Sequence, residues 1–349
     1  MAGKFWNPNR LMNLKDIRGE KPEIFMVAGN RTAGKTFGTK TYLINGVKSG
    51  KIRQFFCLVR FGYEIDGYCE NFFQDIGPVK FPDDKMTTKR GVKDAYSMLL
   101  LNGKVVGYVI SINQADLIKR HFSKFTMCDI GFFDEFQSET GKYCPKEIDK
   151  FFSIHTSLAR GDGNYTRHVP VIMCANNVSL LNPYYVALGI HKRLQPETKT
   201  LRGDGWVLEL VNNEDAKEAI KLSGFGRAFA GTRQAQYAAG DKYLIDTSAF
   251  VESIEGQKMP LLNMVINGEK CTVWSVKDSG LIYVTEKGDP ACDYTITGRI
   301  TDHGSGTVLA KYGEQQVKVF KKMFELGEVR FQNVKCKNIF LDMIGLSLM

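Results

Sequence analysis

The chain has 349 residues, a length that suggests two domains, and its 43% hydrophobic and 24% charged residues exclude collagen-like, low-complexity and largely disordered proteins. Its formal net charge is +9. No apolar run approaches the roughly 18 residues of a membrane helix, and the N-terminus lacks the apolar core of a signal peptide. We therefore expect a globular, cytoplasmic protein with no membrane partner. The eight cysteines and five histidines have no metal-binding spacing, so we expect neither a zinc site nor a disulfide framework.

The positive charge is concentrated in the first part of the chain. Residues 1–200 hold 29 Lys and Arg against 19 Asp and Glu, whereas residues 201–349 hold 18 against 19. A basic surface attracts nucleic acid because binding releases counterions. An ordinary solvated surface gives the same count, so the charge alone leaves nucleic-acid binding open.

Four nearly continuous apolar runs in the first 200 residues predict buried strands, at 24–29, 54–60, 128–134 and 169–175. Unbroken runs of this length are typical of parallel strands covered by helices on both faces, which indicates an α/β sheet. Helices are expected between the strands, at 35–49, 64–76 and 144–159. An Asn-Gly turn within residues 97–111 predicts a hairpin added to the edge of the sheet.

The second part of the chain differs from the first in composition and in its pattern of apolar residues. Residues 195–235 are charged and glycine-rich, and we place the connection between two domains there. Residues 264–286 then predict antiparallel strands with turns at Asn267-Gly268 and at 278–280, and a helix follows at 311–326, stopped by Gly327. Strands followed by helices predict a small α+β domain.

The first strand leads directly into a Gly-x-x-x-x-Gly-Lys-Thr motif that opens a helix-like segment. Such a Walker A loop surrounds phosphates with backbone N–H groups and a helix N-terminus, while Lys35 reaches the β and γ oxygens and Thr36 ligates Mg²⁺. The motif therefore predicts ATP and Mg²⁺ as cofactors, against the alternative of a glycine-rich structural turn. The expected nucleotide-binding residues of the loop are Gly29, Asn30, Arg31, Thr32, Ala33, Gly34, Lys35 and Thr36.

Two adjacent acids end the strand at 128–134. Asp134 is placed to hold Mg²⁺ through water, and Glu135 to polarise an attacking water, as in ATPases of the additional-strand, catalytic-glutamate class. A solvated turn is the alternative interpretation.

Two further polar features lie near the last predicted strand of this sheet. Asn176 and Asn177 follow it, where one of them can sense the γ-phosphate, with a turn-capping role as the alternative. Arg160 precedes it on a glycine-rich loop, from which a cation can enter a neighbouring subunit's site and neutralise charge in the transition state. A solvated side chain is the alternative for Arg160.

These motifs, with FWNPNRLMN, QFFCLVR, NNVSLLNPYY and FGRAFAGT, resemble the DNA-packaging ATPases of small tailed phages of the phi-twenty-nine type, relatives of the large terminases. The resemblance covers nearly the whole chain. It implies a P-loop NTPase domain at 1–195, a linker or lid at 196–240 and a ribonuclease-H-like α+β domain at 241–349. It implies an ATP-driven, homo-oligomeric ring, pentameric in the family, that drives double-stranded DNA through the portal of a procapsid. The expected location is the host cytoplasm and, transiently, the portal vertex, with a structural RNA as a candidate partner.

The resemblance also implies roles for single residues. Arg160 corresponds to a trans-acting arginine finger, Arg60 to a residue able to engage the catalytic glutamate, and Asn176 to a coupling residue. The segment around Asn7 and Arg10 corresponds to the region that covers the adenine base. A second trans-acting basic residue is expected ahead of Asp134, and the candidates are Lys119, Arg120 and Lys124.

In terminases, the ribonuclease-H-like domain holds two metals with clustered acids. Here Ser275 and Val276 stand where the first acid belongs, and the remaining acids are scattered. We therefore expect no nuclease activity, and docking to the portal, a nucleic acid or neighbouring subunits instead. The scattered acids are Asp278, Asp289, Asp293 and Asp302.

A charged pore would grip DNA phosphates without reading bases. The candidate contacts are Lys85, Lys89, Arg90, Lys93, Lys119, Arg120 and Lys124, each with a solvated face as the alternative. Three other functions share parts of this pattern: a nucleotide or small-molecule kinase, a helicase or replication ATPase, and a ring that uses ATP only to assemble.

Overall fold

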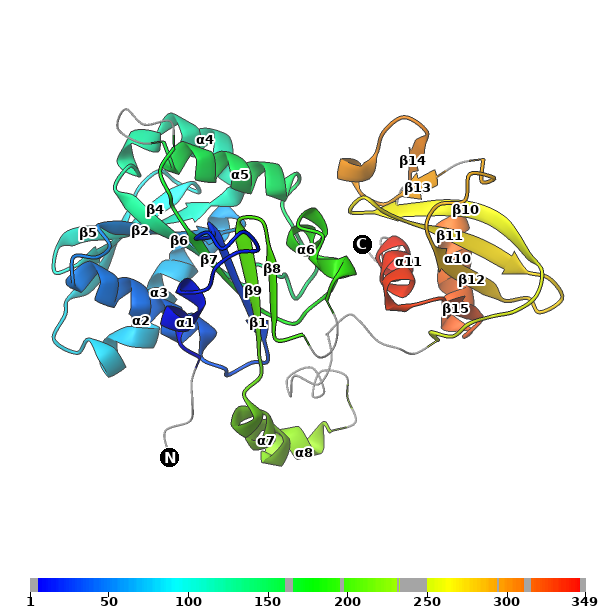
Figure 1. Cartoon of the computed structure of the whole chain (residues 1–349), viewed down its shortest axis with the longest axis horizontal. Helices are drawn as coiled ribbons and strands as arrows, with labels where there is room; N and C mark the ends of the chain where they lie inside the picture. The colour runs from blue at the N-terminus through cyan, green and yellow to red at the C-terminus, as the bar shows by residue number, and fades with distance from the viewer. Residues whose placement is uncertain are drawn as a thin grey trace. The chain divides into compact units, whose positions relative to one another are not determined.

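The computed structural model describes residues 6–160, 166–194, 198–230, 232, 250–293, 295–310 and 315–345 (Figure 1). The chain divides into two compact units, one formed by Met1–Asn177 with Leu194–Asp241 and the other by Val178–Arg193 with Lys242–Met349. Among the described helices, none has the length and apolarity needed to span a bilayer.

The first unit is built on a nine-stranded sheet with the order β3-β4-β5-β2-β6-β7-β1-β9-β8. Its six central strands are parallel: β1 (Ile24–Gly29), β2 (Gln54–Val59), β5 (Lys104–Ser111), β6 (Cys128–Asp134), β7 (Val171–Asn176) and β9 (Trp206–Val211). Antiparallel strands complete both edges: β3 (Met86–Arg90) and β4 (Tyr96–Leu101) on one side and β8 (Thr200–Gly203) on the other. The four predicted strands and the predicted hairpin are confirmed, and β7 lies between β1 and β6.

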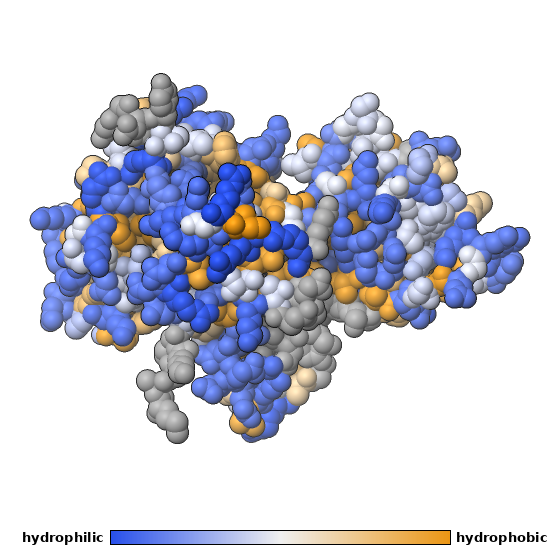
Figure 2. Space-filling view, viewed as in Figure 1, coloured by the Kyte–Doolittle hydropathy of each residue, from blue (hydrophilic) through white to orange (hydrophobic). Residues whose placement is uncertain are grey.

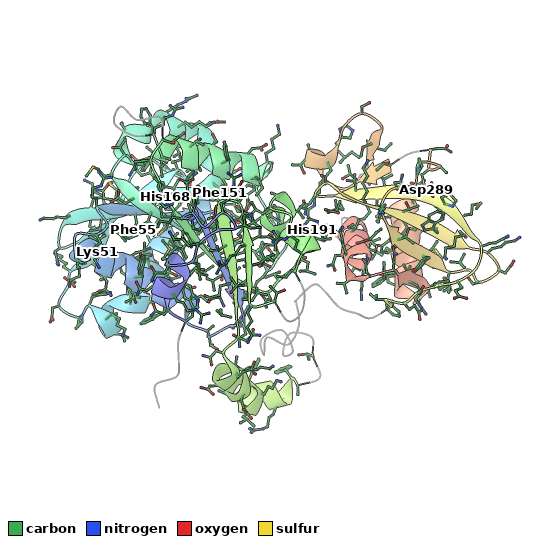
Figure 3. All side chains as sticks on the ribbon, in the orientation of Figure 1. Lys51, Phe55, Phe151, His168, His191 and Asp289 are labelled. Atoms are coloured by element: carbon green, nitrogen blue, oxygen red, sulfur yellow. The ribbon has the colours of Figure 1, made fainter. Side chains whose placement is uncertain are left out.

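Helices cover both faces of this sheet, which is why its central strands are mainly apolar. On one face, α1 (Pro8–Met12), α2 (Lys35–Lys48) and α3 (Ile65–Lys80) pack on a core that includes Phe25, Phe55 and Phe72. On the other, Phe151 of α5 (Glu147–Leu158), which is labelled in Figure 3, stacks on Phe133 of β6 at a ring-centroid distance of 6.4 Å. The short helix α4 (Ala115–Arg120) packs beside α5. The three helices predicted between the strands are confirmed with shifts of a few residues at their ends.

The interval 196–240, expected as a linker, differs from that expectation. It contains β8 and β9, which extend the first sheet, because β9 pairs with β1 in parallel from Ile24–Trp206 to Gly29–Val211. Gly205, with a φ of 74°, forms the turn between β8 and β9 that the sequence analysis assigned to a connection. Two helices follow, α7 (Glu214–Leu222) and α8 (Gly224–Ala228), and residues 233–249 lie outside the described chain.

The second unit has a six-stranded mixed sheet with the order β14-β13-β10-β11-β12-β15. Its elements are α6 (Pro183–Ala187), β10 (Lys258–Ile266), β11 (Glu269–Val276), β12 (Ile282–Glu286), β13 (Thr295–Thr297), β14 (Thr307–Leu309), α10 (Gln315–Glu325), β15 (Val329–Phe331) and α11 (Val334–Gly345). Both predicted turns are confirmed, with left-handed residues at Asn267 and Asp278. Gly327, also left-handed, follows the end of α10, as predicted.

Two of the scattered acids of the second unit, Asp289 and Asp302, have local structural roles. The carboxylate of Asp302 accepts the N–H groups of Asn267 and Gly268 at 2.6 and 2.8 Å and so holds the β10–β11 turn. Asp289 accepts the N–H of Ala291 at 2.8 Å. Within the ranges that the structure describes, no three His, Cys, Asp or Glu side chains are grouped so as to hold a metal.

A partly buried ionic cluster joins α11 and the segment 178–193 to the second sheet. Glu269 of β11 accepts a hydrogen bond from Lys335 Nζ at 2.7 Å and is hydrogen-bonded to His191 Nε2. Burial acts to raise the pKa of Glu269, but the bonds and charges of Lys335 and His191 outweigh it and lower the pKa to about 2. The cluster therefore stabilises the unit whenever Glu269 is ionised.

The Glu269→Gln variant tests this contribution. Since the folded pKa lies below the ordinary value of 4.5, the stabilisation is complete above pH 4.5 and is lost as the pH falls toward 2. We expect the variant to unfold more easily at pH 7, by on the order of 2 kcal/mol, with a difference that shrinks below pH 4.5. The difference in the free energy of unfolding is measured by urea unfolding followed by Trp274 fluorescence, in a background in which the other tryptophans are replaced by Phe. An equal difference at pH 7 and pH 2.5 would contradict the ionic origin.

Candidate functional site

The Gly29–Thr36 loop joins β1 to α2, and its last two residues, Lys35 and Thr36, begin that helix. A Cβ at Gly29 would lie 1.8 Å from the carbonyl oxygen of Val211, so only glycine allows β9 to approach β1 here. Thr32 and Gly34 have φ angles of 64° and 81°, which turn the chain back before α2 begins at Lys35. The loop therefore brings backbone N–H groups and a helix N-terminus to one place, a geometry that binds anions.

Lys35 is buried at the centre of this loop, with 7% of the residue exposed. Its Nζ donates to the carbonyl oxygens of Asn30 at 2.7 Å and Gly29 at 3.3 Å, and to Asn176 Oδ1 at 3.4 Å. Burial lowers its pKa to about 8, against the charge of Asp134. A buried ammonium whose recorded acceptors are neutral oxygens is well suited to receive an anion.

Two carboxylates lie beside it at the end of β6. Thr36 Oγ1 donates to Asp134 Oδ1 at 2.9 Å, and burial raises the pKa of Asp134 to about 6, against the charge of Lys40. Glu135 is exposed and has a φ of 55°, an unfavourable conformation for a non-glycine residue that functional sites often contain. Partial desolvation and then the charge of Glu139 raise the pKa of Glu135. Thr36 and Asp134 thus place two hard oxygen atoms side by side, next to a carboxylate that faces solvent, and such oxygens could hold a magnesium ion.

Arg60 fixes the main chain that carries Glu135. Its buried guanidinium donates to the carbonyl oxygens of Glu135 at 2.8 Å and of Phe136, pairs with Glu147 at 3.1 Å and lies 4.8 Å from the ring of Tyr143. The resemblance predicted that Arg60 engages Glu135. In the structure, Arg60 donates a hydrogen bond to the main-chain carbonyl oxygen of Glu135. Glu147, whose side chain is 1% exposed, was not predicted from the sequence.

Asn176 connects the loop to the segment after β6. Its Oδ1 accepts from Lys35, and its Nδ2 donates to Glu139 at 3.1 Å. Glu139 also pairs with Arg31 of the loop at 2.6 Å. The sequence analysis missed Glu139, although a second acid four residues after Glu135 was a usable signal. The neighbouring Asn177 has a buried Oδ1 without a hydrogen-bond partner in the described part of the chain.

The N-terminal segment is tied to both the loop and β9. Trp6 donates its N–H to Ala33 at 3.1 Å and its indole N–H to Glu209 at 2.7 Å, and Arg10 pairs with the same buried carboxylate. Asn7 caps α1 by accepting the N–H of Asn9. Glu209 was missed by the sequence analysis, although it is the one acid in the apolar strand β9.

A groove of about 870 Å³ runs along α2 from Gly34 at the loop. Asn7 is among its lining residues and Arg10 is not, since Arg10 is directed to Glu209. Aromatic side chains and lysines share the lining, which includes Trp6, Phe37, Tyr42, Lys48, Lys51 and Lys80.

The remaining predicted residues lie on the surface. Arg160 is exposed two residues beyond the end of α5. Hydrophilic side chains cover much of the visible face of the first unit (Figure 2). Arg90 pairs with Asp66, and Lys119 with Asp116. All seven candidate DNA contacts are exposed: Lys85, Lys89, Arg90, Lys93, Lys119, Arg120 and Lys124.

Two solved structures share this fold. One is the bacteriophage Phi-29 viral genome packaging motor assembly, with a TM-score of 0.62, 22% identity and coverage of 98% of this chain and 99% of that chain. The other is the Phi-28 gp11 DNA packaging motor, with a TM-score of 0.59, 17% identity and coverage of 100% and 99%. The fold is therefore the one found in subunits of phage packaging motors.

The relationship extends to sequence. A DNA packaging protein of Bacillus phage B103 is 24% identical over 327 residues, which cover 91% of this chain and 95% of that protein. The family model of the podovirus DNA encapsidation protein (Gp16) matches residues 2–346, and the chain belongs to this family. The resemblance inferred from the sequence motifs is thereby confirmed.

Proposed function

We propose that this DNA encapsidation protein is an ATP-driven motor that moves double-stranded DNA through the portal into a preformed capsid. The observation that carries the proposal is the convergence of Lys35, the Thr36–Asp134 pair and Glu135 at the carboxyl ends of β1 and β6, with β7 between these strands. This order supports a P-loop NTPase of the additional-strand, catalytic-glutamate class. Such a motor works in the host cytoplasm and, transiently, at the portal vertex.

Each residue of the site then has a task. The loop N–H groups and Lys35 bind the phosphates, while Thr36 and Asp134 would hold Mg²⁺, which neutralises phosphate charge when bound. The carboxylate of Glu135 orients the attacking water and accepts its proton. Arg60 keeps the strained main chain of Glu135 in place. Asn176 senses the γ-phosphate, since it already bridges Lys35 and Glu139.

The groove beside the loop is our candidate for the adenine base. Its position next to Gly34 and its aromatic lining support this assignment, with Asn7 as a base contact. Arg10, the other residue assigned by the resemblance, contributes by holding α1 against Glu209.

The ring and its partners complete the proposal. Arg160 acts as an arginine finger in the neighbouring subunit's site, with a second basic group supplied from Lys119, Arg120 or Lys124, in a homo-oligomeric ring that is pentameric. The exposed basic residues around β3 and α4 grip DNA phosphates. The second unit is a ribonuclease-H-like domain without nuclease activity. It docks to the portal, a structural RNA or neighbouring subunits.

The Lys35→Met variant tests the nucleotide site directly. Loss of a charge-assisted contact to phosphate should weaken binding of a fluorescent ATP analogue with Mg²⁺ by about 10- to 100-fold. The matched control is Lys104→Met, at an exposed lysine that begins β5. Equal affinity of both variants and the wild type would contradict the assignment.

A further inference from the structure

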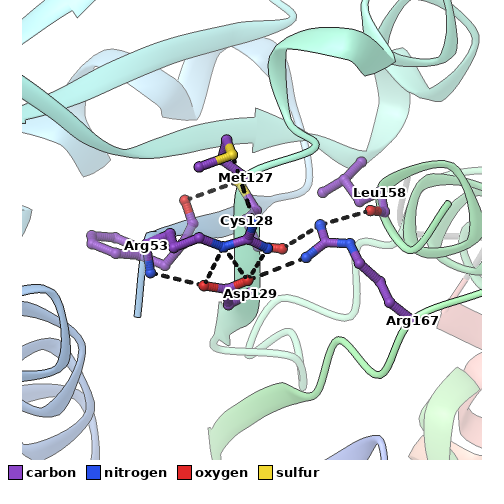
Figure 4. A network of polar contacts seen from close by, with 7 residues as sticks. Arg53, Met127, Cys128, Asp129, Leu158 and Arg167 are labelled. Atoms are coloured by element: carbon purple, nitrogen blue, oxygen red, sulfur yellow. Dashed lines mark hydrogen bonds and ion pairs between the residues drawn. The ribbon is translucent and has the colours of Figure 1, made fainter. Parts of the chain in front are cut away.

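Arg167 clamps the end of the helix that precedes Arg160 (Figure 4). Its backbone N–H donates to the carbonyl oxygen of Ala159 at 2.8 Å, and its Nη2 donates to that of Leu158 at 3.0 Å. The last carbonyl groups of a helix have no partner within the helix, so Arg167 satisfies two of them. The chain is thus held at the residue directly before Arg160.

The other side of the clamp is the amino end of β6. The same Nη2 atom of Arg167 donates to the carbonyl oxygen of Cys128 at 2.6 Å, and Nη1 pairs with Asp129 at 3.2 Å. Asp129 is itself held by Arg53, whose Nη2 lies 2.5 Å from Oδ1 and whose backbone N–H donates to Oδ2 at 2.8 Å. Arg53, Asp129 and Arg167 therefore form one network, which we call the β6 clamp, that joins α5 to β6 and to the residue before β2.

The clamp determines which site Arg160 can reach. A strand advances about 3.3 Å per residue, so Asp134, at the carboxyl end of β6, lies about 20 Å from Cys128. The main chain just before Arg160 is held near the amino end of β6, whereas Glu135 follows the carboxyl end of that strand. A finger anchored there is separated from its own subunit's catalytic carboxylate by about the length of β6.

We infer that Arg167 is a positioning residue for the arginine finger: through the β6 clamp it fixes Arg160 for use in the neighbouring subunit's site. The inference rests on the proposed function of Arg160. Arginine suits this task because its planar fork serves two carbonyl groups and a carboxylate at once, which a lysine cannot do.

Complementation between inactive subunits tests it. In a ring with shared sites, a Glu135→Gln subunit still supplies a finger, and an Arg160→Ala subunit still supplies a glutamate, so their mixture regains activity at some interfaces. We expect Arg167→Ala to lower DNA-stimulated ATP turnover by about 10- to 100-fold, with little change in KM for ATP. Mixed with Glu135→Gln it should regain turnover, and mixed with Arg160→Ala it should not. Arg167→Lys should lie between Arg167→Ala and the wild type.

The opposite pattern overturns the inference. If Arg167→Ala regains turnover with Arg160→Ala but not with Glu135→Gln, then Arg167 supports its own subunit's site through β6. Wild-type turnover by Arg167→Ala overturns it as well. If the mixture of Arg160→Ala with Glu135→Gln stays inactive, the proposed function of Arg160 in a shared site is contradicted. The inference about Arg167 is then contradicted as well, because it rests on that function. Arg167→Lys, which keeps the charge beside Asp129, serves as the test variant if Arg167→Ala does not fold.

Discussion

Glu135→Gln is expected to lower ATP turnover by about two to four orders of magnitude while MgATP still binds. The substitution keeps the shape of the side chain but removes the carboxylate that accepts a proton from water. It leaves Lys35 and the Thr36–Asp134 pair in place, so nucleotide binding should stay within a few-fold of wild type. Single-turnover hydrolysis and binding of a fluorescent ATP analogue measure the two effects separately.

The control for this variant is Glu70→Gln, which changes an exposed glutamate on α3 in the same unit. It should leave both hydrolysis and binding unchanged. Glu135→Gln subunits that still package DNA at the wild-type rate would contradict a catalytic glutamate. They would favour the ring that uses ATP only to assemble.

Arg160→Ala is expected to have an effect of similar or larger size, because an arginine finger contributes about 10³- to 10⁵-fold to turnover. Since the finger acts on a neighbour, each variant subunit also disables a site whose other residues are wild type. An equimolar mixture with wild type should therefore hydrolyse less ATP than dilution alone predicts. Steady-state hydrolysis is measured over a range of mixing ratios. Its dependence on the fraction of Arg160→Ala subunits should be curved and lie below the straight line that dilution predicts.

The matched control is Arg18→Ala, at an exposed arginine whose ion pair with Asp204 is also exposed. Its mixtures should behave as wild type. A linear dependence of activity on the fraction of Arg160→Ala subunits would show that each subunit hydrolyses ATP by itself.

The parts of the fold that could be predicted are those determined by local pattern. Strands β1 and β6 match their predicted ranges because each is a nearly continuous apolar run ended by a glycine or an acid. The strand β9 was missed because Glu209 interrupts its apolar pattern. That carboxylate is buried only because Trp6 and Arg10, about 200 residues away in sequence, bind it. No local window contains such a partner.

The residues of the candidate site also fall into those that local sequence motifs predict and those that they do not. The Gly29–Thr36 loop, Asp134 and Glu135 follow from motifs with fixed spacing, and the structure brings them together. The residues that hold the functional side chains in place carry no motif: Glu147 acts on Glu135 through Arg60, and Arg167 acts on Arg160 through the β6 clamp. Their roles arise from carbonyl groups and charges that the folded sheet places beside them, and a sequence pattern does not encode those neighbours.

The central claim is that ATP hydrolysis by this chain drives DNA movement. Steady-state ATP hydrolysis by the full-length protein, with and without double-stranded DNA, tests it most directly. We expect DNA to raise turnover and Glu135→Gln to abolish the stimulated rate. Turnover that is indifferent to DNA but rises with an added nucleoside or nucleotide acceptor would contradict a DNA motor and favour a kinase.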